Sequence, residues 1–259
     1  MTKGTTRRLA ASALHRADAV LFPTLIGVTT SDPVVALTFD DGPDADTTLL
    51  LASQLGKRGH MCTFFFLSQR ATLVANVARR VVALDHEVAL HGPDHSPIAG
   101  WRFLRVIIRL SAARSTLRRA ASSPVRYFRP PYGWQSRRSY LATRACGLLP
   151  VLWAVDAHDY LSLETQEVAE RVFENLHAGD IVLLHERYEE PVSPVPPTLA
   201  GAETALWPPN PVELAALIMA GLDARGLRSV TISELISRGT PRRIRWIHNP
   251  RQPSPQGPA

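Results

Sequence analysis

Five short segments carry side chains that could bind a metal ion or move a proton. In chain order they are residues 38–44, 86–95, 127–133, 153–160 and 181–185. Each lies where an apolar run typical of a buried strand gives way to carboxylates, imidazoles or a guanidinium. A single cluster of this kind is often structural, but five in succession are hard to attribute to chance. They predict an active site built from loops that follow strands.

Two adjacent carboxylates, Asp40 and Asp41, follow the first apolar run. Neighbouring strand residues point to opposite faces, so the following turn must re-aim one of them if both serve one site. A structural interpretation is equally open. Asp-Gly-Pro is favourable turn chemistry, and Asp44 could cap the next helix.

Two histidines four residues apart, His91 and His95, follow the strand that begins after His86. Neutral imidazoles at this spacing can face one metal ion, and a carboxylate can complete a three-ligand site that leaves a position for water. An isolated pair of this kind is more often a polar part of a loop. His86 precedes the strand, and we interpret it as structural.

The remaining clusters supply a guanidinium, a carboxylate and another imidazole. Arg129 precedes Pro130 and Pro131, whose rigid backbone suits a guanidinium that binds a carboxylate bidentately, although a surface arginine would fit the same loop. Asp159 and His185 also follow apolar runs. A lone histidine after a buried strand is usually structural, so only the combination favours function.

Alternating apolar and helical segments predict an α/β fold. The expected strands are 34–39, 61–67, 87–90, 125–128, 148–153, 180–184 and 228–232. The expected helices are 45–58, 70–83, 100–121, 137–146, 164–177 and 211–225. About seven strands in this alternation suit a single-domain, distorted parallel (β/α) barrel that resembles a TIM barrel. We assign this catalytic domain to residues 34–240.

The segments outside this alternation differ in composition. Residues 1–33 are expected to form a helix and a linker, and the Arg/Pro-rich tail 241–259 is expected to be flexible because it can bury little apolar surface. The proline-rich stretch 186–211, which includes Trp207, is a candidate substrate lid. Cys62 and Cys146 are expected to be buried thiols and not a disulfide.

Composition limits the partners and the compartment only loosely. The chain has 259 residues and a net charge of +6, which favours anionic partners such as lipid head groups or polyanionic glycans. No secretion signal is recognisable at the N-terminus, so we expect a cytoplasmic protein or one at the cytoplasmic membrane face, with an extracellular location left open. No specific binding of nucleic acid is expected.

The order and spelling of the five clusters resemble the polysaccharide deacetylases of carbohydrate esterase family 4, the NodB-homology family, over about residues 34–238. The resemblance rests on Thr-Phe-Asp-Asp-Gly-Pro, two histidines four apart, Arg-Pro-Pro-Tyr, an Asp-x-x-Asp motif and Leu-x-His. It implies metal-dependent removal of N-acetyl groups from an amino-sugar glycan or a lipid-linked amino sugar. Peptidoglycan and chitin-like oligomers are both open as substrates.

The resemblance also implies a role for each motif residue. The implied metal ligands, for Zn²⁺ or alternatively Co²⁺, are Asp41, His91 and His95. The implied catalytic residues are the base Asp40, the acid His185, Arg129, which orients the base, and Asp159, which partners the acid. The expected substrate contacts are Tyr132, Leu183, Tyr160, Trp153 and Trp207. Two positions depart from the pattern: Gly92 replaces a Ser or Thr, and Tyr160 replaces a Trp.

Other functions stay open at this point. The same metal chemistry could serve an amidohydrolase that acts on a non-glycan amide, and a catalytically silent basic binding module is a weaker alternative. Residues 101–119 carry several arginines and no acidic residue, a pattern found in helices that lie on anionic membranes. A solvated outer face of a barrel helix explains the same pattern.

Overall fold

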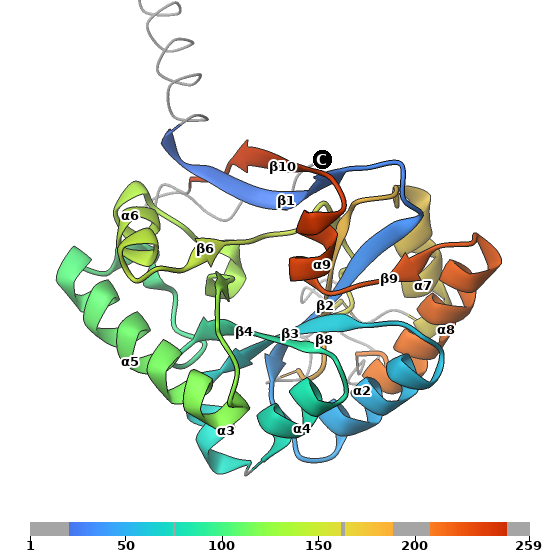
Figure 1. The fold of residues 1–259 in the computed structure, drawn as a ribbon, viewed down its shortest axis with the longest axis horizontal. Coiled ribbons are helices and arrows are strands. Elements are labelled where there is room, and N and C mark those ends of the chain that lie inside the picture. Colours follow the sequence, from blue (N-terminus) through green and yellow to red (C-terminus); the bar gives the residue numbers. More distant parts are fainter. Residues whose placement is uncertain (1–20, 75, 162–163, 189–207, 248–259) are drawn as a thin grey trace, which may run out of the picture.

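The computed structural model describes residues 21–74, 76–161, 164–188 and 208–247 (Figure 1). Seven parallel strands form one curled sheet in the order β6-β5-β4-β3-β2-β8-β7, and β9 pairs with the start of β2. These strands are β2 (Val34–Gly42), β3 (Cys62–Leu67), β4 (Glu87–Gly92), β5 (Tyr127–Phe128), β6 (Leu149–Pro150), β7 (Val155–Asp156), β8 (Ile181–His185) and β9 (Arg228–Ser229). The predicted α/β fold with a parallel (β/α) barrel is confirmed.

Helices surround the sheet (Figure 1). They are α2 (Thr47–Lys57), α3 (Ser68–Leu73), α4 (Val77–Ala83), α5 (Phe103–Ala121), α6 (Arg137–Ala145), α7 (Thr165–Glu174), α8 (Pro211–Ala224) and α9 (Ile232–Ser237), with short 3₁₀ turns η1 (Ile98–Gly100) and η2 (Pro131–Gly133). The single helix predicted over 70–83 is wrong, because Asn76 adopts a left-handed conformation that a continuing helix excludes. The strand predicted over 228–232 ends at Ser229 because Thr231 caps α9.

Alternation along the strands produces two separate cores. In β2, Val35, Leu37 and Phe39 face the helices and join the larger cluster of buried side chains. Val34 and Ala36 belong instead to the smaller cluster inside the curled sheet. Thr38 and Asp40 continue this second, inward series, because side chains two residues apart share a face. The strand therefore brings Asp40 to the carboxyl end of the sheet interior.

Both ends of the domain differ from the prediction, because they pair as a two-stranded antiparallel ribbon. β1 (Pro23–Thr29) pairs with β10 (Thr240–Arg245), at the top of Figure 1, where a linker and a flexible tail were predicted. Leu25 and Val28 of β1 are buried in the core inside the sheet, and the pairing satisfies both backbones. Short segments whose partner lies about 200 residues away give no local signal. The predicted helix before β1 and the last tail residues lie outside the described residues.

Two further observations concern single features. Cys62 and Cys146 are buried free thiols, as predicted. Within the described ranges, no helix is long and apolar enough to cross a membrane.

Candidate active site

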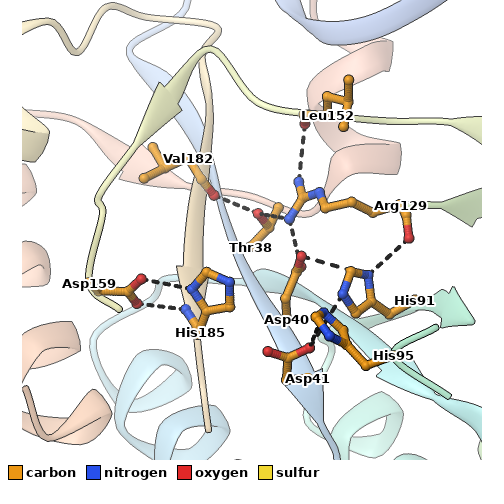
Figure 2. A network of polar contacts seen from close by, with 10 residues as sticks. All are labelled: Thr38, Asp40, Asp41, His91, His95, Arg129, Leu152, Asp159, Val182 and His185. Carbon is orange, nitrogen blue, oxygen red and sulfur yellow. Dashed lines mark hydrogen bonds and ion pairs between the residues drawn. The ribbon is translucent and has the colours of Figure 1, made fainter. Parts of the chain in front are cut away.

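The ends of β2, β4, β5, β7 and β8 converge on one polar cluster (Figure 2). Parallel pairing places Asp40 of β2 in register with His185 of β8. The cluster contains all seven residues to which the sequence assigned catalytic or metal-binding roles: Asp40, Asp41, His91, His95, Arg129, Asp159 and His185. Because parallel strands present their carboxyl ends at the same edge, residues up to about 145 positions apart meet here.

A backbone irregularity lets both adjacent carboxylates face the site. The register between β2 and β3 shifts between Asp40 and Gly42, and Asp41 has a φ of 74°, in the left-handed region. This bulge turns the Asp41 side chain away from its regular strand direction. The change in side-chain direction that two adjacent carboxylates need to share one site therefore occurs at Asp41 itself.

Asp41, His91 and His95 form a compact set of metal-type ligands. The Oδ1 atom of Asp41 lies 3.3 Å from Nε2 of His91 and 3.3 Å from Nε2 of His95. Their ligand atoms all lie within 4.8 Å of one another. Asp41 Oδ1 is buried without a hydrogen-bond partner among the described residues. A buried carboxylate oxygen facing two imidazole nitrogens fits a divalent cation.

A backbone carbonyl fixes the orientation of the first histidine. The Nδ1 atom of His91 lies 2.9 Å from the carbonyl oxygen of Arg129, to which it donates a hydrogen bond. Nε2 is then the unprotonated nitrogen, directed at Asp41, which is the tautomer that a metal ligand needs. The loop after β5 thus supports the ligand geometry as well as supplying Arg129.

The loop between the two histidines explains one departure from the family motif. Gly92 has a φ of 135°, and a Cβ there would lie 2.8 Å from the carbonyl oxygen of Asp94. A serine or threonine would therefore be strained. The Asp94 carboxylate accepts from Arg109 Nη2 at 2.9 Å and from the Ser96 amide at 3.0 Å, which braces the loop.

Arg129 and Asp40 form a buried ion pair. The Arg129 Nη1 atom donates to Asp40 Oδ1 at 2.7 Å and to Thr38 Oγ1 at 2.8 Å, while Nη2 donates to the Leu152 carbonyl at 3.1 Å (Figure 2). The guanidinium also lies over the Phe65 ring, 4.1 Å from its centroid. A fully buried arginine held on several sides fixes the position of the neighbouring carboxylate. The contact to Asp40 uses one nitrogen and is therefore not bidentate.

His185, which is partly buried, and the buried Asp159 form a second pair, which faces the first across the site (Figure 2). The Nδ1 atom of His185 lies 2.7 Å from Asp159 Oδ1, and the His185 backbone amide donates to Asp159 Oδ2, also at 2.7 Å. Burial alone would lower the pKa of His185, but the charge and hydrogen bond of Asp159, with Asp41 and Asp40, raise the pKa to about 10. The imidazole is therefore charged at neutral pH.

The electrostatics of the ligand set favour a bound positive charge. Burial opposes ionisation of Asp41, yet the nearby imidazoles of His91, His185 and His95 hold the pKa of Asp41 well below its usual range. Burial likewise opposes a charged His91, but Asp40 and Asp41 raise its pKa. In such a site a metal cation and protons compete for the same positions.

The predicted substrate contacts divide into three groups. Leu183 and Trp153 are buried beside the site, and Trp153 Nε1 has no hydrogen-bond partner in the described chain. Tyr132 and Tyr160 are exposed, with their rings 4.4 Å from His95 and 5.6 Å from His185. Trp207, like most of the lid predicted over 186–211, lies outside the described residues.

The sequence segments 86–95 and 153–160 also contain histidines without a role in the site. The His86 side chain is buried, with Nε2 2.8 Å from the Ala52 carbonyl and Nδ1 accepting from the Cys62 amide at 3.1 Å. His158 lies 2.9 Å from Asp156 on the same loop as Asp159. His86 thus occupies the structural position that its place before the strand indicates.

Sequence analysis missed two residues that shape the site. Glu186 follows His185, is buried, and accepts a hydrogen bond from Thr48 Oγ1. Burial is the main cause that raises its pKa well above the usual carboxylate range. Trp246, beyond β10, donates from Nε1 to the Gly133 carbonyl at 2.9 Å. A carboxylate directly after a buried strand was a usable signal for Glu186, whereas nothing near Trp246 indicates its partner.

Glu186 makes Gly42 a position where a side chain is expected to be costly. A Cβ added to Gly42 would overlap the Oε1 atom of Glu186 and approach the Phe66 ring. Gly42→Ala should lower the free energy of unfolding by about 1–3 kcal/mol through overpacking. Gly100→Ala is the matched control, since a Cβ there has nothing within 4 Å.

Urea denaturation of both variants measures the difference, and Glu186→Ala supplies a second test. Removing the Glu186 side chain should recover most of the cost of Gly42→Ala, because residues in contact are energetically coupled. Equal effects of Gly42→Ala with and without Glu186 would contradict this explanation.

Comparisons with known proteins identify the family and agree with the fold. Residues 27–151 match the family model described as polysaccharide deacetylase. A chitooligosaccharide deacetylase of Sinorhizobium fredii is 32% identical over 158 residues, covering 61% of this chain and 74% of the relative. A peptidoglycan-N-acetylglucosamine deacetylase of Bacillus cereus is 25% identical over 211 residues, covering 81% of this chain and 91% of the relative. The solved family 4 acetyl xylan esterase of Clostridium thermocellum has a TM-score of 0.65 and 27% identity, over 79% of this chain and 90% of that one.

A curled parallel sheet with carboxylates, imidazoles and a guanidinium gathered at its carboxyl edge suits the active site of a hydrolase. The chain belongs to the polysaccharide deacetylase family, which is carbohydrate esterase family 4. It is an enzyme of that class, as the family resemblance of its motifs predicted.

Proposed function

We propose that the enzyme hydrolyses the acetamide of an N-acetylated amino-sugar glycan with a divalent cation held by Asp41, His91 and His95. The observation that carries this proposal is the buried Asp41 Oδ1 atom, which faces both Nε2 atoms at 3.3 Å and has no other partner in the described chain. Zn²⁺ suits two nitrogens and one oxygen. The solved acetyl xylan esterase that resembles this chain is a complex with cobalt, so Co²⁺ is the alternative.

The residues around these ligands suit the two proton transfers of amide hydrolysis. When bound, the cation would polarise the acetamide carbonyl and lower the pKa of a water molecule toward about 7. Asp40, held in place by Arg129, accepts the proton from the water that attacks the carbonyl carbon. The carbonyl π electrons move to oxygen, which gives a tetrahedral oxyanion.

Breakdown of this intermediate needs an acid on the opposite side. The oxyanion re-forms the carbonyl as the C–N bond breaks, and the charged His185 donates a proton to the departing nitrogen. Acetate and a free amino sugar are the products. Asp159 keeps Nδ1 of His185 protonated and leaves Nε2 for the substrate. The backbone near Tyr132 would help to stabilise the oxyanion, as the family resemblance implies.

The side chains that line the site suit a sugar ring carrying a small acyl group. Leu183 lies two residues before His185 on the same face of β8, where it can contact the acetyl methyl. The exposed Tyr132 and Tyr160 rings can pack on the sugar. Partial burial and the charges of Asp156 and Asp159 raise the pKa of Tyr160 to about 12, so its hydroxyl stays a hydrogen-bond donor. Chitooligosaccharides and peptidoglycan fragments are the first substrates to test.

Metal removal tests the proposal directly. Acetate release from N-acetylchitooligosaccharides and peptidoglycan fragments should fall to background after chelation and return with Zn²⁺ or Co²⁺. His95→Ala should bind zinc at least about tenfold more weakly by equilibrium dialysis, because one of three ligands is lost. His177→Ala is the matched control. His177 is an exposed histidine that precedes β8, so it lies at the edge of the sheet opposite the candidate ligands.

Acetate release that survives complete chelation would contradict a metal-dependent mechanism. Release only from simple amides, with none from either glycan, would instead favour an amidohydrolase with a non-glycan substrate.

A further inference from the structure

Positive charge is concentrated in one part of the fold. Residues 95–155 contain eleven arginines and no aspartate, glutamate or lysine, although the whole chain has 23 acidic residues. This stretch covers α5, β5, α6 and β6. Helices α5 and α6 pack side by side at the left of Figure 1, so the exposed arginines of both helices lie on neighbouring elements.

Large apolar side chains are also exposed on these two helices. Leu104 and Ile108 lie one turn apart on α5, with 69% and 67% of their surface accessible, and Leu141 of α6 is 50% exposed. Exposed arginines flank them, and we call the set the arginine-apolar surface: Arg102, Leu104, Arg105, Ile108, Arg138 and Leu141. The buried side of α5 is separate and includes Val106, Leu110 and Leu117.

The arginine-apolar surface begins beside the active-site rim. In a parallel (β/α) barrel, helices start at the edge where the strands end, which is the edge that carries the site. The α5 helix starts eight residues after His95, and Ser136, the N-cap of α6, donates to the Ala99 carbonyl before α5 at 2.8 Å. The His95 ring also packs against the Tyr132 ring of η2. Both helix starts therefore adjoin the loops that hold the candidate metal ligands.

We propose that the arginine-apolar surface docks the enzyme on an anionic lipid bilayer. Arginines alone would suit any polyanion, but leucine and isoleucine side chains exposed between them gain nothing from a soluble polymer. A bilayer satisfies both, because the arginines meet acidic head groups while the apolar side chains enter the acyl boundary. If the proposed deacetylase function holds, a site opening next to this surface acts on amino sugars carried by membrane lipids.

Vesicle co-sedimentation of the full chain tests the docking independently of activity. The wild-type protein should bind vesicles made of phosphatidylglycerol and phosphatidylcholine in equal parts and should not bind phosphatidylcholine alone. The charge variant is Arg102→Gln/Arg105→Gln/Arg138→Gln, and the apolar variant is Leu104→Ser/Ile108→Ser/Leu141→Ser. An arginine at an anionic surface strengthens binding about fivefold, so the charge variant should lose about 100-fold in affinity. The apolar variant should lose roughly tenfold or more.

Matched substitutions elsewhere on the surface control for general effects. The control charge variant is Arg79→Gln/Arg80→Gln/Arg228→Gln, and the control apolar variant is Leu50→Ser/Leu73→Ser/Leu217→Ser, all at exposed positions. Both controls should bind like wild type. All variants should release acetate from a soluble chitooligosaccharide at the wild-type rate, so a failure of docking is distinguishable from a failure of the proposed chemistry.

Three results would overturn the proposal. The first is a wild-type protein that does not bind anionic vesicles. The second is equal binding by the arginine-apolar variants and the controls, which would place the contact elsewhere in the chain. The third is loss of binding in the charge variant alone, together with equally tight binding to a soluble polyanion such as heparin, which would identify an anionic polymer site.

Discussion

Asp40→Asn is expected to lower kcat for acetate release about 1,000-fold, with zinc content unchanged. The substitution keeps the shape of the side chain but removes the basic carboxylate that accepts the proton from water, and general-base catalysis contributes about 10²–10⁴-fold. In the proposed site Asp41, His91 and His95 would hold the cation without Asp40, so metal binding should persist. Steady-state acetate release and metal analysis of the same samples measure both quantities.

The main complication is the buried arginine that Asp40 neutralises. Removing one partner of a buried ion pair costs about 3–5 kcal/mol of stability, so Asp40→Asn must be assayed below its own melting temperature. Thr38→Val is a structural control, because it removes another hydrogen bond from the same Arg129 Nη1 atom and leaves the carboxylate intact. It should reduce kcat less than about tenfold, consistent with the loss of one hydrogen bond. A similar kcat for both variants would show that Asp40 is only structural.

Most of the active site could be predicted because the chemistry sits at strand ends. A run of buried apolar residues before Asp40, His91 or His185 locates the end of a strand, and a parallel sheet brings all such ends to one edge. The bulge at Asp41 was also foreseeable, since two adjacent strand residues cannot otherwise share a face. These inferences need only local sequence and one topological rule.

Features that depend on distant partners could not be predicted. The β1 and β10 segments carry no regular apolar alternation of their own, and each is a strand only because the other satisfies its backbone. Trp246 contacts Gly133 from a segment whose arginines and prolines indicate disorder. The helix predicted over 70–83 is interrupted by the left-handed backbone conformation of Asn76, and the helical sequence pattern of this segment gives no sign of the interruption.

A charged partner also explains why the histidine after β8 differs from an ordinary core histidine. The Asp159 carboxylate accepts from both the ring and the backbone amide of His185, so it fixes the ring's position and its tautomer together. Asp159 comes from a different loop, 26 residues earlier in the chain. The isolated Leu-x-His motif could not distinguish a structural histidine from a charged one, because the distinction lies in this contact.

Asp159→Asn is expected to lower kcat about 100-fold or more and to move the alkaline limb of the kcat/KM profile to lower pH. In the wild type, burial lowers the pKa of His185 but Asp159, with Asp41 and Asp40, raises it to about 10. Without the Asp159 charge, the effect of burial lowers the pKa of His185. The imidazolium then loses its proton at lower pH and can no longer act as the acid. A cation at the proposed site would offset the charges of Asp41 and Asp40, so Asp159 would matter still more in the metal-loaded enzyme.

The same pair predicts how stability depends on pH. Because the folded pKa of His185 is raised above the unfolded value of about 6.5, its contribution is fully present below that pH and is lost as pH rises toward about 10. Asp159→Asn should therefore weaken the alkaline decline in the free energy of unfolding. Asp156→Asn is the matched control, since the Asp156 carboxylate accepts from the His158 amide at 2.8 Å. If both substitutions shift the alkaline limb equally, the effect belongs to the loop's total charge and His185 is not specifically held by Asp159.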